Sequence, residues 1–176
     1  MSRPGRSTWL ADDAATRALG YALAHALDDG DVVALCGPLG AGKTTLAQGF
    51  AKGLDVPPNV RVRSPTFTLC NEVQGRRLLL HMDLYRLGSE DEAEALGFRE
   101  RVGHDGVALV EWADRFPGLL PHHAIWISLE HEGAGRRVTV WEAEGGDPRW
   151  IDAISLPGSG GGTPWTACTH TGPWAD

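Results

Sequence analysis

The sequence predicts an α/β domain built on a mixed, partly antiparallel sheet. A helical segment at 12–27 is followed by a continuous apolar run, Val32–Cys36, of the kind found in parallel strands that are covered on both faces. A glycine-rich turn and a second helical segment come next, so the front half alternates helix and strand. The back half holds apolar segments joined by short glycine turns, which are typical of hairpins.

Each predicted element rests on a local pattern. Leu19 and Leu23 lie four residues apart and share one face of the first helix, and Asp12 and Asp13 suit its positive N-terminal end. Ser89 begins a capping-box pattern that opens a short helix. The remaining predictions are a helix to about residue 54, a proline-rich loop at 55–65, an extended segment at 66–73, a returning strand at 77–82, a short helix at 89–97, a strand at 107–110, paired strands at 124–131 and 136–144, and a helical turn within 147–154.

Length and composition indicate one domain with a tail. The chain has 176 residues, of which 42% are hydrophobic and 22% charged, so it is long enough to bury a core. We expect residues 1–154 to form this domain. In the segment 155–176, Gly, Pro, Ser and Thr dominate, and such a composition buries too little apolar surface to order itself. We therefore expect that tail to be disordered.

The charge and the cysteines exclude several classes of function. With 16 basic and 23 acidic side chains, the net charge is −7, which disfavours non-specific binding to nucleic acid or to anionic membranes. No apolar run approaches the ~20 residues of a membrane span. The three cysteines are odd in number and widely spaced, so they fit neither a disulfide framework nor a zinc site. These features favour a reducing, cytoplasmic setting.

A phosphate-binding loop is the strongest motif of the sequence. The pattern G-x-x-x-x-G-K-[ST] is formed by Gly37, Pro38, Leu39, Gly40, Ala41, Gly42, Lys43 and Thr44, and Thr45 follows in the helix. The glycines allow backbone N–H groups to surround phosphates, and the helix N-terminus favours the same negative charge. Lys43 supplies a point charge for the terminal phosphates, and the Thr44 hydroxyl can bind Mg²⁺. A strand before the loop and a helix after it argue against a chance match.

Two acidic residues follow apolar strands and are candidates for the same site. Glu111 comes directly after the run 107–110, where a phosphate loop needs an acidic residue to hold the ion and its water shell. Asp83 follows the strand at 77–82 and could orient the attacking water or a metal-bound one. Glu111 could instead be an ordinary acidic residue at a strand end, and Asp83 could instead cap the turn that follows its strand. His81 could be a catalytic residue, although a buried, hydrogen-bonded histidine is the more common case, and Trp112 could pack in the core or line the site. Because the chain lacks an N-K-x-D stretch, adenine is favoured over guanine.

Taken together, these segments resemble the TsaE (YjeE) family, the small ATPases of bacterial tRNA threonylcarbamoyladenosine biosynthesis. The resemblance runs from about residue 11 to residue 144. It is carried by the phosphate loop and, in order, by Ser64-Pro65-Thr66-Phe67, His81-Met82-Asp83-Leu84-Tyr85-Arg86, Glu94-Ala95-Leu96-Gly97 and Glu111-Trp112-Ala113-Asp114. The tail has no counterpart in the usual family pattern.

The resemblance implies a fold, an activity and partners. The fold would be a P-loop NTPase-like three-layer sandwich, and the activity would be weak, Mg²⁺-dependent ATP hydrolysis. Thr44 and Glu111 would hold the metal, Lys43 the phosphates, and Asp83 would be essential for turnover. Residues 64–68 would form a switch segment, and Asp12, Asp13 and Arg136 would be candidate adenine contacts. The protein would act on the transferase subunit TsaD and its paralogue TsaB, and would meet tRNA only through that complex.

Two other functions share the phosphate loop. In a small-molecule kinase, four arginines would form a lid over the substrate: Arg76, Arg77, Arg99 and Arg101. In a nucleotide-sensing adaptor, ATP would set a binding surface without being hydrolysed, and Asp83 would be dispensable. The combination of motifs, rather than the loop alone, favours the partner-coupled ATPase.

Overall fold

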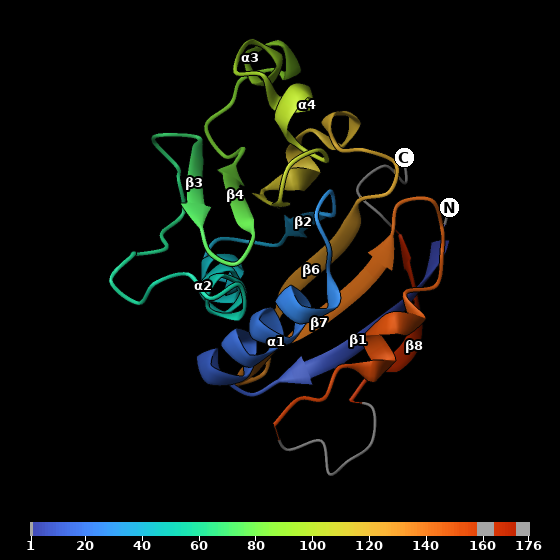
Figure 1. Ribbon diagram of the computed structural model, residues 1–176. Coiled ribbons are helices and arrows are strands. Elements are labelled where there is room, and N and C mark those ends of the chain that lie inside the picture. Colours follow the sequence, from blue (N-terminus) through green and yellow to red (C-terminus); the bar gives the residue numbers. More distant parts are fainter. Residues whose placement is uncertain (1, 158–163, 172–176) are drawn as a thin grey trace.

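The structure, a computed structural model, describes residues 2–157 and 164–171, which form one eight-stranded mixed sheet between helices (Figure 1). In sheet order the strands are β3 (Cys70–Gln74), β4 (Leu78–Asp83), β5 (Val107–Glu111), β2 (Val32–Cys36), β6 (Ile125–Glu132), β7 (Gly135–Glu142), β1 (Ser2–Leu10) and β8 (Thr166–Thr171). The four strands β4, β5, β2 and β6 run parallel, and all other pairs are antiparallel. The predicted mixed, partly antiparallel sheet is confirmed.

Helices cover both faces of the sheet, which gives three layers. The helices α1 (Asp13–Ala26) and α2 (Lys43–Gly53) pack on one face, where Val33 and Leu35 of β2 join their apolar core. The opposite side chains of β2 join a second core. That core is covered by α3 (Glu90–Ala95), α4 (Phe98–Arg101) and the 3₁₀ turns η1 (Ala113–Arg115) and η2 (Pro117–Leu119). A third 3₁₀ turn, η3 (Arg149–Ala153), confirms the helical turn expected within 147–154.

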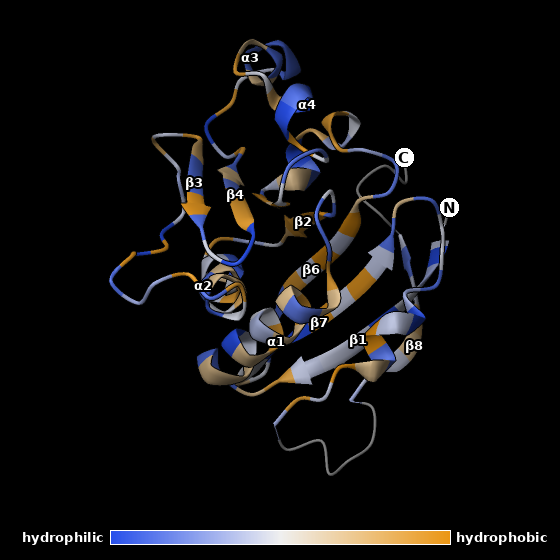
Figure 2. Ribbon diagram, in the orientation of Figure 1, coloured by the Kyte–Doolittle hydropathy of each residue, from blue (hydrophilic) through white to orange (hydrophobic). Residues whose placement is uncertain are grey.

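Hydropathy explains why the central strands are central. β2, β4 and β6 carry long stretches of hydrophobic residues, whereas α3 is largely hydrophilic (Figure 2). All five residues of β2 and all five of β5 are buried, as expected for parallel strands covered on both faces. In the part of the chain that the structure describes, no helix has the length and apolar character needed to cross a membrane.

The helix α2 is held close to α1 by glycines. A Cβ atom on Gly49 would lie 2.0 Å from the carbonyl oxygen of Arg17, and one on Gly20 would lie 2.2 Å from the carbonyl oxygen of Leu46. Side chains at these positions would therefore force the helices apart. Because α2 begins at Lys43, this close contact also fixes the position of the phosphate loop relative to the sheet.

The helix caps agree with the sequence. Asp12 caps α1, since its carboxylate accepts a hydrogen bond of 2.8 Å from the backbone N–H of Ala15. Ser89 caps α3 by accepting from the N–H of Glu92 at 3.3 Å. The helix ends before Gly97, whose φ of 72° belongs to the left-handed region that closes helices.

The extended segment predicted at 66–73 is shorter in the structure. β3 begins only at Cys70, and the preceding residues form a turn in which the N–H of Leu69 donates to the carbonyl of Pro65. Leu69 has a φ of 62°, which no strand residue adopts. The apolar and threonine side chains in this stretch indicated a strand, but the turn brings Thr66 to the edge of the site instead.

The tail and the N-terminus depart most from the expectation. Thr166–Thr171 form β8, which pairs antiparallel with β1 from Ser2↔Thr171 to Ser7↔Thr166. Trp165 is buried in the core beside the sheet. The expectation of a disordered tail is therefore wrong at these residues, because β8 supplies hydrogen-bond partners to the otherwise open edge of β1. The parts of the tail at 158–163 and 172–176 lie outside the described residues. The strand β1 itself was not predicted.

Candidate functional site

A cavity of about 290 Å³ lies where β2, β4 and β5 end, beside the start of α2. In open α/β sheets, ligands bind in the crevice outside the carboxyl ends of the strands. Most of the predicted site residues gather there. The cavity is lined by Leu39, Gly40, Gly42, Lys43, Thr44, Thr45, Ser64, Thr66, Asp83, Tyr85, Glu111 and Trp112.

The phosphate loop has the backbone that its glycines allow. It connects β2 to α2, and Gly37, Gly40 and Gly42 have φ values of 131°, 78° and 107°. L-residues rarely adopt such values. At Gly37 a side chain is also excluded by space, since a Cβ atom would lie 2.2 Å from the carbonyl oxygen of Leu129. The loop is thus closely fitted to the sheet, and Ala41 is fully buried.

Lys43 carries a buried positive charge in this loop. Its side chain is 5% exposed, and Nζ donates to the carbonyl oxygens of Gly37 at 2.6 Å and Pro38 at 2.9 Å. Nζ also lies 3.9 Å from the centroid of the Trp112 ring. Burial lowers the pKa of Lys43, while neighbouring carboxylates, Glu111 foremost, act in the opposite direction. An ammonium group held this way can exchange carbonyl partners for the oxygens of a phosphate.

Thr44 and Glu111 meet across the loop. The Thr44 hydroxyl donates to both carboxylate oxygens of Glu111 at 3.2 Å, and Glu111 is 2% exposed. His81 Nε2 lies 2.7 Å from Glu111 Oε1, and this ring is also buried. The register of β4 against β5 explains the contact: His81 is two residues before Asp83, which lies opposite Glu111, so it points to the same face.

The oxygen atoms of Thr44 and Glu111 fit a magnesium site. Mg²⁺ prefers hard oxygen ligands and keeps several waters, so one carboxylate and one hydroxyl suffice beside phosphate oxygens. Among residues 2–157 and 164–171, no group of three or more His, Cys, Asp or Glu side chains could hold a metal ion. A magnesium ion at this site would therefore also need phosphate oxygens and water as ligands. A carboxylate that is buried and held by a neighbouring imidazole is well placed for this role.

Asp83 is buried at the same edge and receives three hydrogen bonds. Its Oδ2 atom accepts from the hydroxyls of Ser64 and, at 3.1 Å, of Thr66, and its Oδ1 accepts from the N–H of Tyr85 at 2.8 Å. The bond to Tyr85 caps the turn after β4, so the structural role considered from the sequence is present. The bonds to Ser64 and Thr66 connect Asp83 to the segment 64–68. These two hydroxyl contacts were not foreseen from the residues alone.

Arg136 and Asp13 lie together beside the loop. Arg136 Nη2 donates to Asp13 Oδ1 at 2.7 Å. Arg136 Nη1 lies 1.9 Å from the Cβ position that a side chain at Gly42 would take, so the guanidinium packs against the loop backbone. Its buried Nε and Nη1 atoms have no hydrogen-bond partner within the described part of the chain. Such donors normally find an acceptor, and a ligand in the loop would offer one.

The structure does not bring the other arginines to this cavity. Arg76 pairs with Asp55 after the end of α2, and Arg77 pairs with Asp28 and Asp29 after the end of α1. Arg99 pairs with Glu94 and Arg101 with Glu72. Arg86 packs against the ring of Phe67 at 4.1 Å. None of these five side chains lines the cavity at the phosphate loop.

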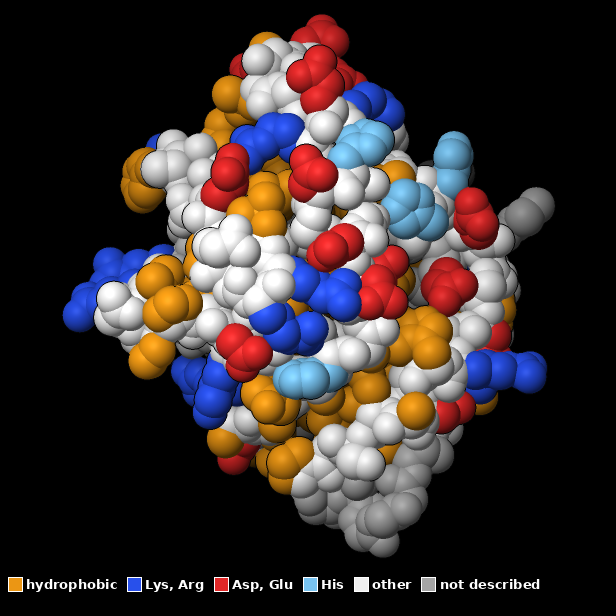
Figure 3. Space-filling model, in the orientation of Figure 1, with side chains coloured by type: hydrophobic (Ala, Val, Ile, Leu, Met, Phe, Trp, Pro, Cys, Tyr) orange, Lys and Arg blue, Asp and Glu red, His pale blue; other side chains and the backbone are white. Residues whose placement is uncertain are grey.

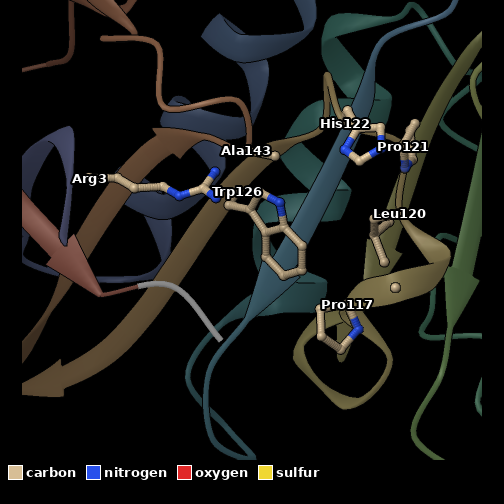
Figure 4. Close-up of a pocket in the computed structure, with 8 residues that line it drawn as sticks. Arg3, Pro117, Leu120, Pro121, His122, Trp126 and Ala143 are labelled. Carbon is tan, nitrogen blue, oxygen red and sulfur yellow. The ribbon is translucent and has the colours of Figure 1, made fainter. Parts of the chain in front are cut away.

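A separate cavity of about 240 Å³ offers no comparable chemistry (Figure 4). Trp126 of β6 faces it, with Arg3 of β1 on one side and the proline-bearing segment before β6 on the other. No carboxylate, cysteine or hydroxyl side chain is among its lining residues. The cavity at the phosphate loop is the candidate functional site, because Lys43, Thr44, Asp83 and Glu111 all line it.

Comparisons with known proteins show the family to which the chain is similar. The family described as Threonylcarbamoyl adenosine biosynthesis protein TsaE matches residues 10–139. A protein of Bacillus subtilis (strain 168), named tRNA threonylcarbamoyladenosine biosynthesis protein TsaE, is 42% identical over 131 residues, which cover 74% of this chain and 80% of that protein. One of the same name from Treponema pallidum (strain Nichols) is 40% identical over 122 residues, covering 69% of this chain and 89% of that one.

A solved structure agrees with these sequence matches. The crystal structure of Bacillus subtilis YdiB resembles the chain with a TM-score of 0.67 and 32% sequence identity. The likeness covers 81% of this chain and 88% of that one. The strand β8 lies beyond the residues that the family matches.

Proposed function

Because the chain belongs to the TsaE family, we propose that it is a Mg²⁺-dependent ATP-binding and ATP-hydrolysing protein that is required for forming N6-threonylcarbamoyladenosine in tRNA. The observation that carries the proposal is the convergence of Lys43, Glu111 and Asp83 on one cavity at the phosphate loop. Its place of action would be the cytoplasm.

The loop and its neighbours would hold the nucleotide. Backbone N–H groups of 37–45 and the start of α2 favour the negative charge of phosphates, and Lys43 adds a mobile ammonium. Arg136 would contact the rest of the nucleotide, since its Nη2 is held by Asp13 and its buried Nε and Nη1 have no hydrogen-bond partner among the described residues. The absence of a guanine-reading motif supports ATP.

Thr44 and Glu111 would hold the magnesium ion, directly or through water. When bound, Mg²⁺ neutralises charge that develops on the phosphate oxygens during transfer. His81 keeps the Glu111 carboxylate in place through its bond to Oε1. It therefore acts as a positioning residue and not as a ligand.

Asp83 would support hydrolysis itself. Its carboxylate can accept a hydrogen bond from the attacking water and so orient it toward the terminal phosphate. Ser64 and Thr66 now occupy Oδ2, and rearrangement of the 64–68 segment would change what that oxygen faces. This arrangement supports slow turnover in the isolated protein and faster turnover when a partner moves the segment.

The partners in this proposal are TsaD and its paralogue TsaB. The net charge of −7 disfavours direct binding of tRNA by this chain. The tRNA would then be bound by the complex. The alternative function, a small-molecule kinase, is less well supported. The four arginines expected to form its lid each pair with an Asp or Glu side chain away from the phosphate loop.

ATP hydrolysis measured with and without the TsaB–TsaD pair tests the proposal. We expect slow, Mg²⁺-dependent turnover alone and faster turnover with the pair. Glu111→Gln should weaken the Mg²⁺ dependence and the activity, whereas Glu130→Gln, at an exposed carboxylate of β6, should change neither. Stimulation by a metabolite instead of the protein pair would favour the kinase, and ATP binding without any hydrolysis would favour an adaptor.

A further inference from the structure

A groove on the α1–α2 side of the molecule gathers basic side chains that the site does not use. It has a volume of about 820 Å³ and lies between the exposed sides of α1 and α2 and the segment 55–63. Lys52, Arg61 and Arg63 line it, and Arg17 borders it through hydrogen bonds to Gln48. Figure 3 shows basic side chains beside hydrophobic ones at the left edge of the molecule, where Figure 1 places the segment between α2 and β3. We call this the basic groove.

The positive charge of the basic groove is not neutralised by the chain. Within the described residues, Lys52, Arg61 and Arg63 take part in no ion pair, although acidic side chains outnumber basic ones by 23 to 16. Arg76 and Arg77, which follow soon after along the chain, each pair with an aspartate. The groove contains one carboxylate, that of Asp55, which lies 3.9 Å from Arg76. The groove is thus a local positive surface on an acidic protein.

Between these charges the groove presents apolar surface. Val60 is 40% exposed and Tyr21 is 44% exposed, and both line it. The consecutive prolines Pro57 and Pro58 stiffen the segment 55–63, because each fixes its own φ angle. A ligand that fits must therefore combine negative charges with apolar groups along an extended shape.

The segment 55–63, which forms one wall of the basic groove, continues directly into the segment 64–68 that contacts Asp83. The Gln48 side chain donates to the carbonyl oxygen of Val62 at 3.3 Å, which fixes the wall to α2. Arg63 is followed by Ser64, whose hydroxyl donates to Asp83. One peptide bond thus separates a groove residue from a residue that contacts the proposed catalytic carboxylate. A molecule bound in the groove can shift Ser64 and change the hydrogen bonds of Asp83.

We propose that the basic groove binds an extended, carboxylate-bearing segment of the protein partner, and that this contact couples the partner to ATP turnover. The inference rests on the proposed function and adds to it the surface and the chemistry of the contact. Carboxylates of the segment would pair with Arg61, Arg63 and Lys52, and its apolar side chains would cover Val60 and Tyr21. RNA fits less well: single-stranded RNA needs several aromatic faces for base stacking, and Tyr21 is the one aromatic residue lining the groove.

Charge reversal within the groove tests the inference. Arg61→Glu and Arg63→Glu are each compared with Arg149→Glu, which makes the same change in net charge at a side chain that is 80% exposed in η3, away from the groove. For each protein one measures the affinity for the TsaB–TsaD pair, ATP turnover alone, and turnover at increasing concentrations of the pair. Arg61→Glu and Arg63→Glu should each lower the affinity at least tenfold and leave turnover alone unchanged. Binding by the wild type should weaken as salt rises, and less so in these variants.

The outcomes separate this inference from the proposed function. If the wild type hydrolyses ATP and responds to the pair, but Arg61→Glu and Arg63→Glu respond as Arg149→Glu does, the inference alone is overturned. If the pair neither binds nor stimulates the wild type, the proposed partnership fails and the inference fails with it. If the groove variants instead lose a tight affinity of the isolated protein for tRNA, the groove is an RNA site and the inference is overturned.

Discussion

Lys43 and Lys52 are the two lysines of the chain, and their surroundings differ. Lys43 is nearly buried and has two backbone carbonyls and the Trp112 ring as partners, whereas Lys52 is exposed on α2. Moving an ammonium group out of water is unfavourable unless polar partners replace the water. The buried charge of Lys43 therefore persists because the loop is shaped around it, and it is ready to bind an anion.

We predict that Lys43→Ala lowers ATP binding or turnover at least tenfold, which corresponds to about 1.4 kcal/mol. The variant removes the point charge that faces the terminal phosphates. Lys52→Ala is the matched control and should leave both properties of the isolated protein unchanged. Calorimetric titration with ATP and steady-state hydrolysis measure the two effects. Normal hydrolysis by Lys43→Ala would contradict the assignment of the loop.

Asp83 combines a structural and a chemical role, and one substitution separates them. Asp83→Asn retains an oxygen that can accept from Tyr85 but removes the negative charge. We expect ATP affinity within a few fold of the wild type and the loss of most turnover, including turnover stimulated by the partner. If Asp83 only capped the turn, the substitution would cost about 1 kcal/mol of stability and hydrolysis would stay near normal. Affinity, melting temperature and turnover, all measured on this variant, distinguish the two roles.

At the scale of elements, the contact between α1 and α2 fixes the start of α2 and hence the loop. Glycine in a helix interior normally lowers stability by about 0.5–1 kcal/mol relative to alanine. Gly20, Gly49 and Gly53 nevertheless lie where the two helices meet. A Cβ atom at any of these positions would overlap a backbone carbonyl oxygen of the other helix, so only glycine allows the helices to pack this closely. The closeness of the helices outweighs helix propensity at these positions.

We predict that Gly49→Ala destabilises the protein, although alanine is the better helix former. The new Cβ atom would lie 2.0 Å from the carbonyl oxygen of Arg17, so the helices must separate. Overpacking of this kind costs about 1–3 kcal/mol, which exceeds the gain in propensity. Thermal and urea unfolding measure the change, and Lys52→Ala on the exposed side of α2 should leave the midpoint nearly unchanged. A higher melting temperature for Gly49→Ala would show that the helices tolerate the separation.

At the scale of the whole molecule, the distribution of charge matters more than its sum. Within the described residues, the ion pairs of the structure involve eight arginines, so their positive charge is compensated locally. The basic groove is different, since Arg61, Arg63 and Lys52 have no ionic partner within the described residues. Three positive charges are few compared with the six to ten phosphate contacts of a typical nucleic-acid site.

We therefore predict that the isolated protein binds tRNA at best weakly at physiological salt. With a net charge of −7, long-range repulsion opposes the few basic contacts that the surface offers. Gel-shift or fluorescence titration with total tRNA at 150 mM salt measures the affinity, and the same titration with the TsaB–TsaD pair present provides a comparison. Tight binding of tRNA by the protein alone would contradict this prediction.

Local sequence patterns are sufficient to predict the central strands, the two long helices and the phosphate loop. These features depend on local patterns: a continuous apolar run gives β2, leucines four apart give α1, and glycines at fixed spacing give the loop. The acidic residues at strand ends could also be placed, because parallel strands deliver their carboxyl ends to one edge. The contact of Glu111 with Thr44 and the position of Asp83 opposite Glu111 in the neighbouring strand follow from that rule.

The outer strands and the partners of the buried carboxylates depend on tertiary contacts that no local pattern encodes. β1 contains Pro4 and Gly5, and β8 lies in a segment rich in small polar residues, so neither has a strong strand pattern. They form because each supplies the backbone hydrogen bonds that the other lacks, across a separation of about 160 residues in the chain. In the same way, the bonds from Ser64 and Thr66 to Asp83 and from His81 to Glu111 join distant segments. Local sequence encodes propensity, whereas such pairings exist only once the sheet has brought the segments together.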